Sequence, residues 1–357
     1  MAAEDDDGAL LERLVARYSP SGHESAAVRE FVRSARRLGY SARTDAVGNG
    51  LARVGRGHPR IVFLGHIDTV EGRLPVRRAR GRLYGRGAVD AKGPLAAALR
   101  AGVDLPGSGE YLVVASVGEE TDSRGARHLA PRLRPDAVIA GEPSGWAGVT
   151  VGYKGELRVT ATFCGRRTHY SSPCPTAADR AVDWLTAVRA IARERSTDSR
   201  FRSLTAKAVA LETEGPGDRE RARVTVDLRL PPGLSTTELL GRLRAVADRP
   251  ALAVSVRVEP LDRPASDPVA RALIEGIRAV GGRPTVWRKA GTSDLNLVAP
   301  VWNVPGAAYG PGDARLDHTD RESVSFAELE RSVAVLRVAL ARLRGAVPTL
   351  RRSAAGA

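Results

Sequence analysis

Residues 61–70 read IVFLGHIDTV, and this stretch decides the fold. It opens with four apolar residues, a run too short for a helix and typical of a buried strand. A histidine just beyond the carboxyl end of such a strand lies where α/β proteins collect ligand and catalytic groups, and His66 has that position. Asp68 can accept the second ring N–H of His66 and fix its tautomer, as carboxylates do for metal-bound imidazoles. Taken alone, His66 would more often be a structural histidine.

Short apolar runs alternate with helical patterns around this stretch, which predicts an α/β domain with a mostly parallel sheet. After about Val151 the pattern changes to alternating strands with two helices, typical of a separate α+β module. Helix, strand and helix signals then resume, so the simplest topology is a module inserted into a discontinuous domain. The expected bounds are 1–152 and 263–346 for the two parts of the discontinuous domain, 153–262 for the inserted domain and 347–357 for a disordered tail.

The composition favours a folded protein in the cytoplasm. With 357 residues and 43% hydrophobic content, the chain can bury a sizeable core and a second domain. No apolar run approaches the roughly 20 residues that cross a bilayer, and the first residues are acidic where a signal peptide would be basic. We therefore expect no membrane association. Cys164 and Cys174 are expected to be free thiols, because disulfides are rare in reducing compartments.

The formal net charge of +14 raises the question of a nucleic-acid partner. Arginine is spread through every segment, no basic helix or nucleic-acid motif is recognisable, and aromatic residues are only 4%, too few for an obvious stacking platform. We expect no nucleic-acid binding. A coding bias toward alanine, arginine and glycine explains the excess charge as well as an acidic partner does.

Further segments each supply a potential metal ligand. GRGAVDAKG places Asp90 in a glycine-flanked turn before a helix, where its ordinary role would be an N-cap. SVGEE places Glu119 and Glu120 directly after a strand, where an acidic turn would ordinarily be solvated. GEP places Glu142 at the end of another strand, and DHTD contains His318 ahead of the last helix.

Together, these residues form a set with metal-ligand chemistry. Neutral imidazoles and carboxylates suit Zn²⁺ and its borderline neighbours, whereas an all-oxygen site would suit Mg²⁺ or Ca²⁺. Two metal ions need a bridging carboxylate. Asp90 is the natural bridge, because the glycines on both sides let the backbone approach closely.

The order of these motifs resembles the dinuclear M20 metallopeptidase clan, and the resemblance covers essentially the whole chain. It implies a zinc-exopeptidase-like catalytic domain with an inserted lid and dimerisation domain, in a homodimer. It also implies two divalent metal ions, one bound by His66, Asp90 and Glu142 and the other by Asp90, Glu120 and His318.

The resemblance further assigns roles around the metals. Asp68 would orient His66, and Glu119 would be the general base. The clan also carries a cis peptide bond after the bridging aspartate, here Asp90–Ala91.

Two weaker assignments concern the substrate. His169 in THYSSP is similar to a lid histidine of the clan that stabilises the oxyanion, although a lone histidine at such a junction is ordinarily neutral to function. Arg229 and the segment Gly291, Thr292 and Ser293 resemble substrate-carboxylate contacts, for which a guanidinium and backbone amides are suitable.

Within the clan, GRGAVDAKGP and VGYKGEL are most similar to the lysine/ornithine hydrolases that act on an amino-group carrier protein. Those zinc or cobalt enzymes release an amino acid from the γ-carboxyl of the C-terminal glutamate of a very acidic carrier. An arginine-rich segment between the first two ligands would steer such a substrate, unless it is simply a solvated hairpin. Its arginines are Arg73, Arg77, Arg78, Arg80, Arg82 and Arg86.

Other functions stay open at this point. The enzyme alternatives are a deacylase of N-acyl amino acids, of the acetylornithine or succinyl-diaminopimelate type, and a dipeptidase. A non-catalytic metal-binding scaffold is the alternative of another class. No residue decides whether the released amino acid is lysine, ornithine or a specialised one.

Overall fold

The computed structural model describes residues 7–103, 105, 108–169, 171–215 and 218–345. These residues divide into two compact units, each described here by itself. Unit 1 comprises the described parts of 1–151, 263–287 and 293–357, and unit 2 comprises those of 152–262 and 288–292. The division into a catalytic domain and a lid stays a prediction, and the expected tail at 347–357 lies outside the described residues.

The central sheet of unit 1 is built around four mutually parallel strands, in the order β6-β3-β7-β15. Every residue of β6 and β7 is buried, as expected for strands covered on both faces. The α/β class with a largely parallel sheet is therefore confirmed. The bounds are β3 (Arg60–His66), β6 (Gly109–Ser116), β7 (Ala137–Gly141) and β15 (Gly306–Ala308).

Antiparallel strands extend this sheet on both sides. One edge is formed by β2 and then β1, and the other side by β8, which pairs with β15, β13 and β14. A small separate sheet has the order β16-β5-β4. The bounds are β1 (Ser41–Thr44), β2 (Gly50–Arg56), β4 (Arg77–Ala79), β5 (Arg82–Tyr84), β8 (Gly148–Tyr153), β13 (Leu261–Asp262), β14 (Thr285–Lys289) and β16 (Ser323–Ser325).

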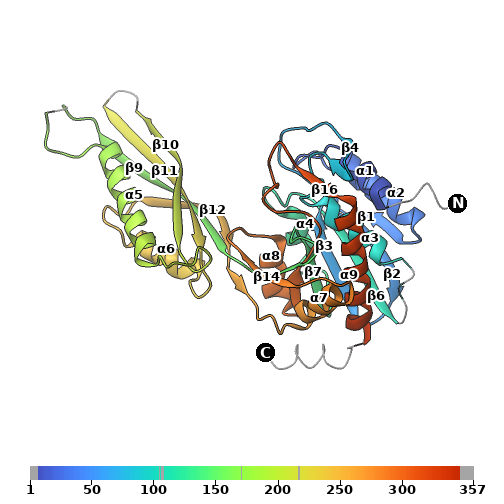
Figure 1. The fold of residues 1–357 in the computed structure, drawn as a ribbon. Helices are drawn as coiled ribbons and strands as arrows, with labels where there is room; N and C mark the ends of the chain where they lie inside the picture. Colours follow the sequence, from blue (N-terminus) through green and yellow to red (C-terminus); the bar gives the residue numbers. More distant parts are fainter. Residues whose placement is uncertain (1–6, 104, 106–107, 170, 216–217, 346–357) are drawn as a thin grey trace. The chain divides into compact units, whose positions relative to one another are not determined.

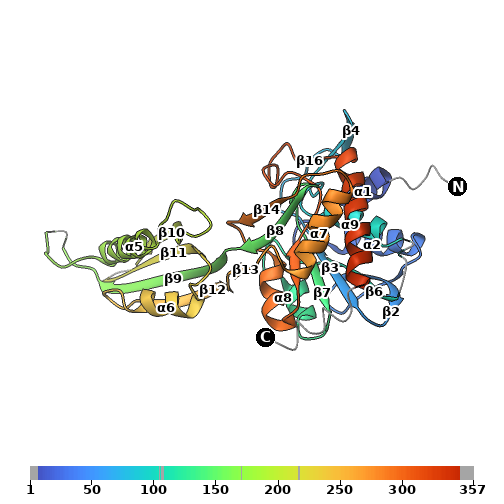
Figure 2. The same cartoon turned by 60° about the horizontal axis from the view of Figure 1, so that its bottom comes forward.

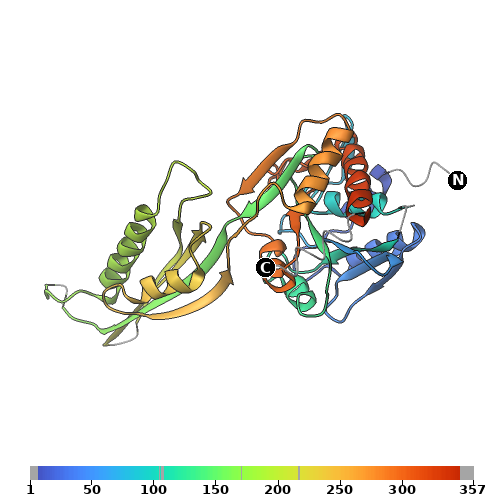
Figure 3. The same cartoon turned by 90° about the horizontal axis from the view of Figure 1, so that it is seen from below.

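Helices cover the sheet of unit 1 and share one hydrophobic core with it. α9 packs against α7, α3 and α1, and α7 and α9 lie side by side in Figures 1, 2 and 3. α7 begins where Asp267 accepts the backbone N–H of Val269, with proline at the first helical position. The bounds are α1 (Asp7–Val15), α2 (Ser25–Arg37), α3 (Lys92–Ala101), α4 (Arg124–Leu129), α7 (Pro268–Ala279), α8 (Asp294–Trp302) and α9 (Phe326–Gly345).

Unit 2 is a four-stranded antiparallel sheet, in the order β10-β11-β9-β12, with two helices (Figure 2). A capping box between Thr176 and Asp179 starts α5. Both helices share one core cluster with the strands, in which Trp184 is among the largest buried side chains. The bounds are β9 (Gly155–Arg166), α5 (Ala177–Glu194), β10 (Thr205–Glu214), β11 (Arg219–Leu230), α6 (Thr236–Arg244) and β12 (Ala251–Val258).

The structure bears on the cysteines and on possible membrane-spanning helices. Cys164 and Cys174 are both exposed and free. Among the described residues, no helix combines the length and apolar character that a membrane span requires.

Candidate metal centre

The candidate ligands converge because parallel strands end at the same edge of a sheet. His66 is the last residue of β3, and its neighbour in the register is Ser116, the last residue of β6. Glu119 and Glu120 follow β6 after a short turn, and Glu142 directly follows β7. Three separate loops thus deliver side chains to one place, as α/β folds commonly do.

Asp90 lies between the two histidines. Its Oδ1 is 3.0 Å from His66 Nε2, and its Oδ2 is 3.1 Å from His318 Nε2. Glu120 Oε1 is 3.0 Å from the same nitrogen of His318. In two groups, His66 with Glu119 and Glu120, and Asp90 with Glu120 and His318, potential ligand atoms lie within 4.8 Å of one another. One carboxylate therefore faces both imidazoles, one oxygen to each.

The Asp68 carboxylate holds the loop that carries the two glutamates. Its Oδ1 accepts the backbone N–H of Glu119 and its Oδ2 that of Glu120, each at 3.1 Å, and Ser21 donates its hydroxyl at 2.7 Å. His66 Nδ1 lies 3.1 Å from the backbone carbonyl of Asp68 and 3.5 Å from its carboxylate. Asp68 thus contacts His66 as expected, and it also fixes the backbone of the acidic turn.

The carboxyl group of Glu119 has a strongly altered acidity. Burial raises its pKa well above the usual value, and the negative charges of Glu142, Asp294 and Glu120 raise it further, against the opposing effect of His66. Glu142 belongs to neither of the two ligand groups, but this effect places its charge near Glu119. A raised pKa suits a carboxyl group that takes up and returns a proton near neutral pH.

The pKa values of the two histidines are both raised. Burial lowers the pKa of His66, but its hydrogen bonds with Asp68 and Asp90 outweigh burial and hold the pKa well above the ordinary value. Hydrogen bonds with Asp90 and Glu120 raise the pKa of His318 to about 10. Without a metal ion, protons on these imidazoles balance the carboxylates, and a divalent cation would take over that role.

Glu322 is a residue of the site that the sequence did not reveal. Its Oε1 accepts the backbone N–H groups of Val89 and Asp90 at 3.0 and 3.2 Å, so it holds the turn that carries the central aspartate. Its Oε2 accepts Arg86 Nη1 at 2.9 Å, and both side chains are buried. No motif marks Glu322, because its partners are backbone amides more than 230 residues earlier.

The structure corrects the expected arginine collar at Arg86. That guanidinium is buried and bonded to Glu322, to Gly72 O and to Thr319 O, so it cannot steer a substrate. Arg78 is paired with Glu12, and Arg82 donates to Ser323. Arg73, Arg77 and Arg80 are exposed.

The predicted substrate contacts differ in their surroundings. Arg229 lies 2.9 Å from both Glu156 and Asp227 and 3.4 Å from Thr292 Oγ1, so the structure brings Arg229 and Thr292 together. Gly291 is exposed. Ser293 is buried and caps α8 by accepting the N–H of Leu295, which is an ordinary structural role. Their contact with a substrate stays a prediction.

His169 belongs to unit 2, whereas the candidate ligands belong to unit 1. Its Nδ1 accepts the backbone N–H of Ser171 at 3.2 Å and lies 2.7 Å from the hydroxyl of the same residue. A neutral His169 therefore carries its proton on Nε2, which leaves that nitrogen as a donor. The oxyanion role of His169 stays a prediction.

The donor set fits a divalent metal. It combines imidazole nitrogens with carboxylate oxygens, the mixture that Zn²⁺ and its neighbours prefer. The negative charges of neighbouring acids add to the larger effect of burial in raising the pKa of Glu119, and a cation would offset those charges. The Asp90–Ala91 peptide bond is cis, as the resemblance implied.

This fold and this cluster of imidazoles and carboxylates define a metal-dependent hydrolase of amide bonds. The chain belongs to the peptidase family M20/M25/M40, whose sequence profile matches residues 62–342. The relationship expected from the order of the motifs is thereby confirmed.

Individual relatives agree with this assignment. The chain is 39% identical to the LysW-lysine hydrolase of Deinococcus radiodurans over 94% of this chain and 96% of that one. It is 30% identical to the LysW-lysine/LysW-ornithine hydrolase of Sulfurisphaera tokodaii over 90% of both. The fold is similar to that of the M20 family metallo-carboxypeptidase Sso-CP2 from Sulfolobus solfataricus, with a TM-score of 0.75 at 17% identity over 95% of this chain and 99% of that one.

Proposed function

We propose that this enzyme releases lysine or ornithine from an amino-group carrier protein, in amino-acid biosynthesis. The bond that it cleaves is the amide between the released amino acid and the side-chain carboxyl of the carrier's C-terminal glutamate. The observation that carries this proposal is the similarity to the LysW-lysine hydrolase, which extends over nearly the whole of both chains. The cytoplasmic location expected from the sequence belongs to the same proposal.

We infer that the site holds two divalent ions, Zn²⁺ or Co²⁺. His66, Asp90 and Glu142 would bind one, and Asp90, Glu120 and His318 the other. The arrangement of the two Asp90 oxygens, one toward each histidine, supports the bridging role. Such ions supply Lewis acidity toward the scissile carbonyl and make a nearby water more acidic.

The residues of the chain then divide the proton transfers among them. Glu119 accepts a proton from the attacking water as the C–O bond forms, and it donates that proton to the nitrogen as the C–N bond breaks. The raised pKa of Glu119 matches both halves of this task. Asp68 keeps the Glu119 backbone in place through its hydrogen bond to the amide N–H. His169, with its proton on Nε2, would donate to the developing oxyanion.

The homodimer is part of the same proposal. In unit 2, Val209 and Leu211 are more than half exposed on β10, which lies at the edge of its sheet. Exposed apolar side chains on an edge strand are a typical surface for pairing with another chain. We propose that a second copy covers them.

The test compares substrates on the purified, metal-loaded enzyme. The free amino acid released from each substrate is measured by mass spectrometry. It is lysine or ornithine from the carrier conjugate, ornithine from acetylornithine, diaminopimelate from N-succinyl-diaminopimelate and the C-terminal amino acid from a dipeptide. We expect kcat/KM to be highest for the carrier conjugate. A Glu119→Gln variant, assayed in parallel, controls for contaminating hydrolases.

Each alternative gives a different result in this assay. Efficient turnover of a small N-acyl amino acid or a dipeptide, with no turnover of the conjugate, would identify a deacylase or a dipeptidase. A protein that binds metal and hydrolyses none of these compounds would be a scaffold. Either result contradicts the proposed function.

A further inference from the structure

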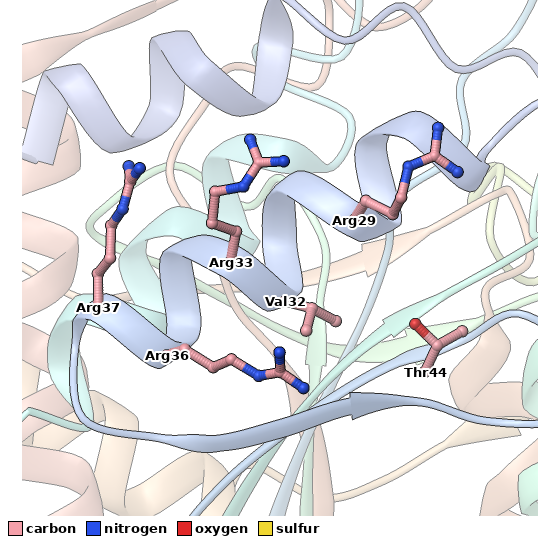
Figure 4. Close-up of a pocket in the computed structure, with 6 residues that line it drawn as sticks. All are labelled: Arg29, Val32, Arg33, Arg36, Arg37 and Thr44. Atoms are coloured by element: carbon pink, nitrogen blue, oxygen red, sulfur yellow. The ribbon is translucent and has the colours of Figure 1, made fainter.

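Helix α2 carries a dense row of arginines on its outer side. Arg29, Arg33, Arg36 and Arg37 project from it, and Val32 and Thr44 complete a surface pocket of about 520 Å³ beside β1 (Figure 4). We call these four arginines and this pocket the α2 arginine face. All four side chains are exposed. No basic helix was recognisable in the sequence, and α2 corrects that expectation.

Among the residues that the structure describes, a single carboxylate offsets the charge of this face. Glu30 is buried beneath it, 2.9 Å from Arg33, and it also faces Arg13 and Arg17 at 3.9 and 3.6 Å, so one carboxylate serves three guanidinium groups. Arg36 donates to the backbone carbonyl of Ala42, which removes no charge. Arg29 and Arg37 make no ion pair within 4.0 Å to any residue that the structure describes.

A purely structural role explains only part of this row. Arg36 and Arg37 lie in the last turn of α2, where a positive charge stabilises the helix dipole. Arg29 lies beyond the first turn, so the dipole gives no reason for its charge. Arg29, Arg33 and Arg37 are four residues apart, and like charges at this spacing repel one another on a helix. Such a concentration of one charge attracts a partner of opposite charge.

The face is connected to the metal centre through the start of α2. Ser21 donates to Asp68 at 2.7 Å, and Glu24, the residue before the helix, accepts Arg124 Nη2 at 2.6 Å. A helix rises about 1.5 Å per residue, so Arg29 and Arg37 lie roughly 8 and 20 Å along the axis from Glu24. An extended peptide covers about 20 Å with about six residues.

We propose that the α2 arginine face is the docking surface for the folded body of an acidic protein substrate, whose extended C-terminal tail reaches the metal centre. This inference rests on the proposed function, which requires a substrate attached to a protein tail. The guanidinium groups of Arg29 and Arg37 select for carboxylates on that body, and a short extended tail spans the length of α2 from Glu24 to Arg37. The face thus separates recognition of the carrier from recognition of the amino acid.

The experiment uses two substrates with the same scissile bond, the carrier conjugate and the small compound γ-glutamyl-lysine, on the full-length metal-loaded enzyme. The double substitution R29Q/R37Q removes the two guanidinium groups without an ion pair and keeps the contacts of Glu30 and Arg36. We expect kcat/KM for the conjugate to fall about tenfold, through KM, because electrostatic complementarity acts mainly on capture. The value for γ-glutamyl-lysine stays unchanged.

The matched control is R271Q/R278Q, which removes two exposed arginines from α7 in the same unit. If the position of the arginines matters, this control leaves kcat/KM unchanged for both substrates. An equal loss of kcat/KM for the conjugate in the control would show that only the net charge matters, and it would overturn the proposal. Unchanged turnover of the conjugate in R29Q/R37Q would also overturn it. Failure of the wild-type enzyme on both substrates contradicts the proposed function instead.

The same variants distinguish a nucleic-acid partner from an acidic protein partner. A DNA duplex is titrated against the wild-type enzyme and R29Q/R37Q by fluorescence anisotropy. Duplex binding that is lost in the variant, with turnover of the conjugate unchanged, would assign the face to nucleic acid and overturn the proposal. Weak binding that is equal in both proteins supports the acidic protein partner.

Discussion

Glu119 and Glu120 are neighbours in the chain, but they have different surroundings. Glu120 lies 3.0 Å from His318 Nε2, within a group of potential ligands that includes Asp90. Glu119 is partly buried, and burial together with the neighbouring negative charges raises its pKa. A carboxyl group cannot hold a metal tightly and also exchange a proton in each turnover, so the two positions should respond differently to the same substitution.

We predict that Glu119→Gln retains the metal and lowers kcat by about 10²–10⁴-fold, the usual contribution of a general base. Glu120→Gln weakens metal binding instead, because an amide is a poorer ligand than a carboxylate. Metal content by inductively coupled plasma mass spectrometry and kcat at saturating metal are measured on both variants. Equal metal loss in the two would undo the assignment.

The histidines predict a pH dependence that differs between the metal-free and metal-loaded protein. The pKa of His318 is raised from 6.5 to about 10 by Asp90 and Glu120. A raised pKa in the folded state contributes stability that is fully present below pH 6.5 and lost as the pH rises through about 10. The metal-free protein should therefore lose thermal stability over this window.

The metal-loaded protein should not show that loss, because a metal-bound imidazole carries no ionisable proton to lose there. Metal binding at pH 7 should also release protons. Melting temperatures between pH 6 and pH 10, with and without chelator, test the first statement. Calorimetric titrations in buffers of different ionisation enthalpy test the second. A flat profile for the metal-free protein would contradict the assigned His318 contacts.

At the scale of elements, Glu322 joins segments that are far apart in the chain. It directly precedes β16, and its carboxylate holds both the backbone of the turn before α3 and the buried guanidinium of Arg86. Removing one partner of a buried ion pair leaves the other charge without compensation, which is costly.

We predict that Glu322→Ala lowers the free energy of unfolding of unit 1 by about 3–5 kcal/mol. Glu330→Ala, at an exposed position of α9, is the control and should change it by less than about 0.5 kcal/mol. Urea unfolding of the metal-free proteins, followed by circular dichroism, gives both values. If the two variants had the same free energy of unfolding, the contacts of the Glu322 carboxylate would not stabilise unit 1.

The sequence predicted elements well where hydrophobic periodicity is strong. The apolar run at 61–64 falls in β3, and the two helices expected after about Val151 are α5 and α6. It missed β1, β4 and β5, which are short and rich in arginine, because their pairing depends on partners elsewhere in the chain rather than on their own residues.

Some residues of the candidate site could be predicted from the sequence, and others could not. The candidate ligands at strand ends were recognisable from their residue type and position, and their roles stay predictions. Glu322 was not, since its role depends on accepting backbone amides in a tertiary contact. Arg86 was expected to steer a substrate because it lies between the first two candidate ligands in the sequence, and only the tertiary structure reveals its buried partner.

At the scale of the whole molecule, a net charge of +14 would attract an acidic substrate over a long range. We predict that kcat/KM for the carrier conjugate falls as salt rises from 0.05 to 0.5 M, because counterions screen long-range attraction at about 10 Å in 0.1 M salt. Turnover of γ-glutamyl-lysine should change little, and stopped assays across this range measure both. A conjugate rate independent of salt would exclude electrostatic capture.

The hydrogen bonds of Asp68 have a consequence for redesign of the enzyme. Because a single carboxylate anchors the amides of two successive acids, their attachment points are set by peptide geometry and not by rotamer choice. Exchanging either glutamate for aspartate would shorten its reach by one methylene while its origin stays fixed. The side-chain length at these two positions can thus be changed without moving the backbone, provided that Asp68 is kept.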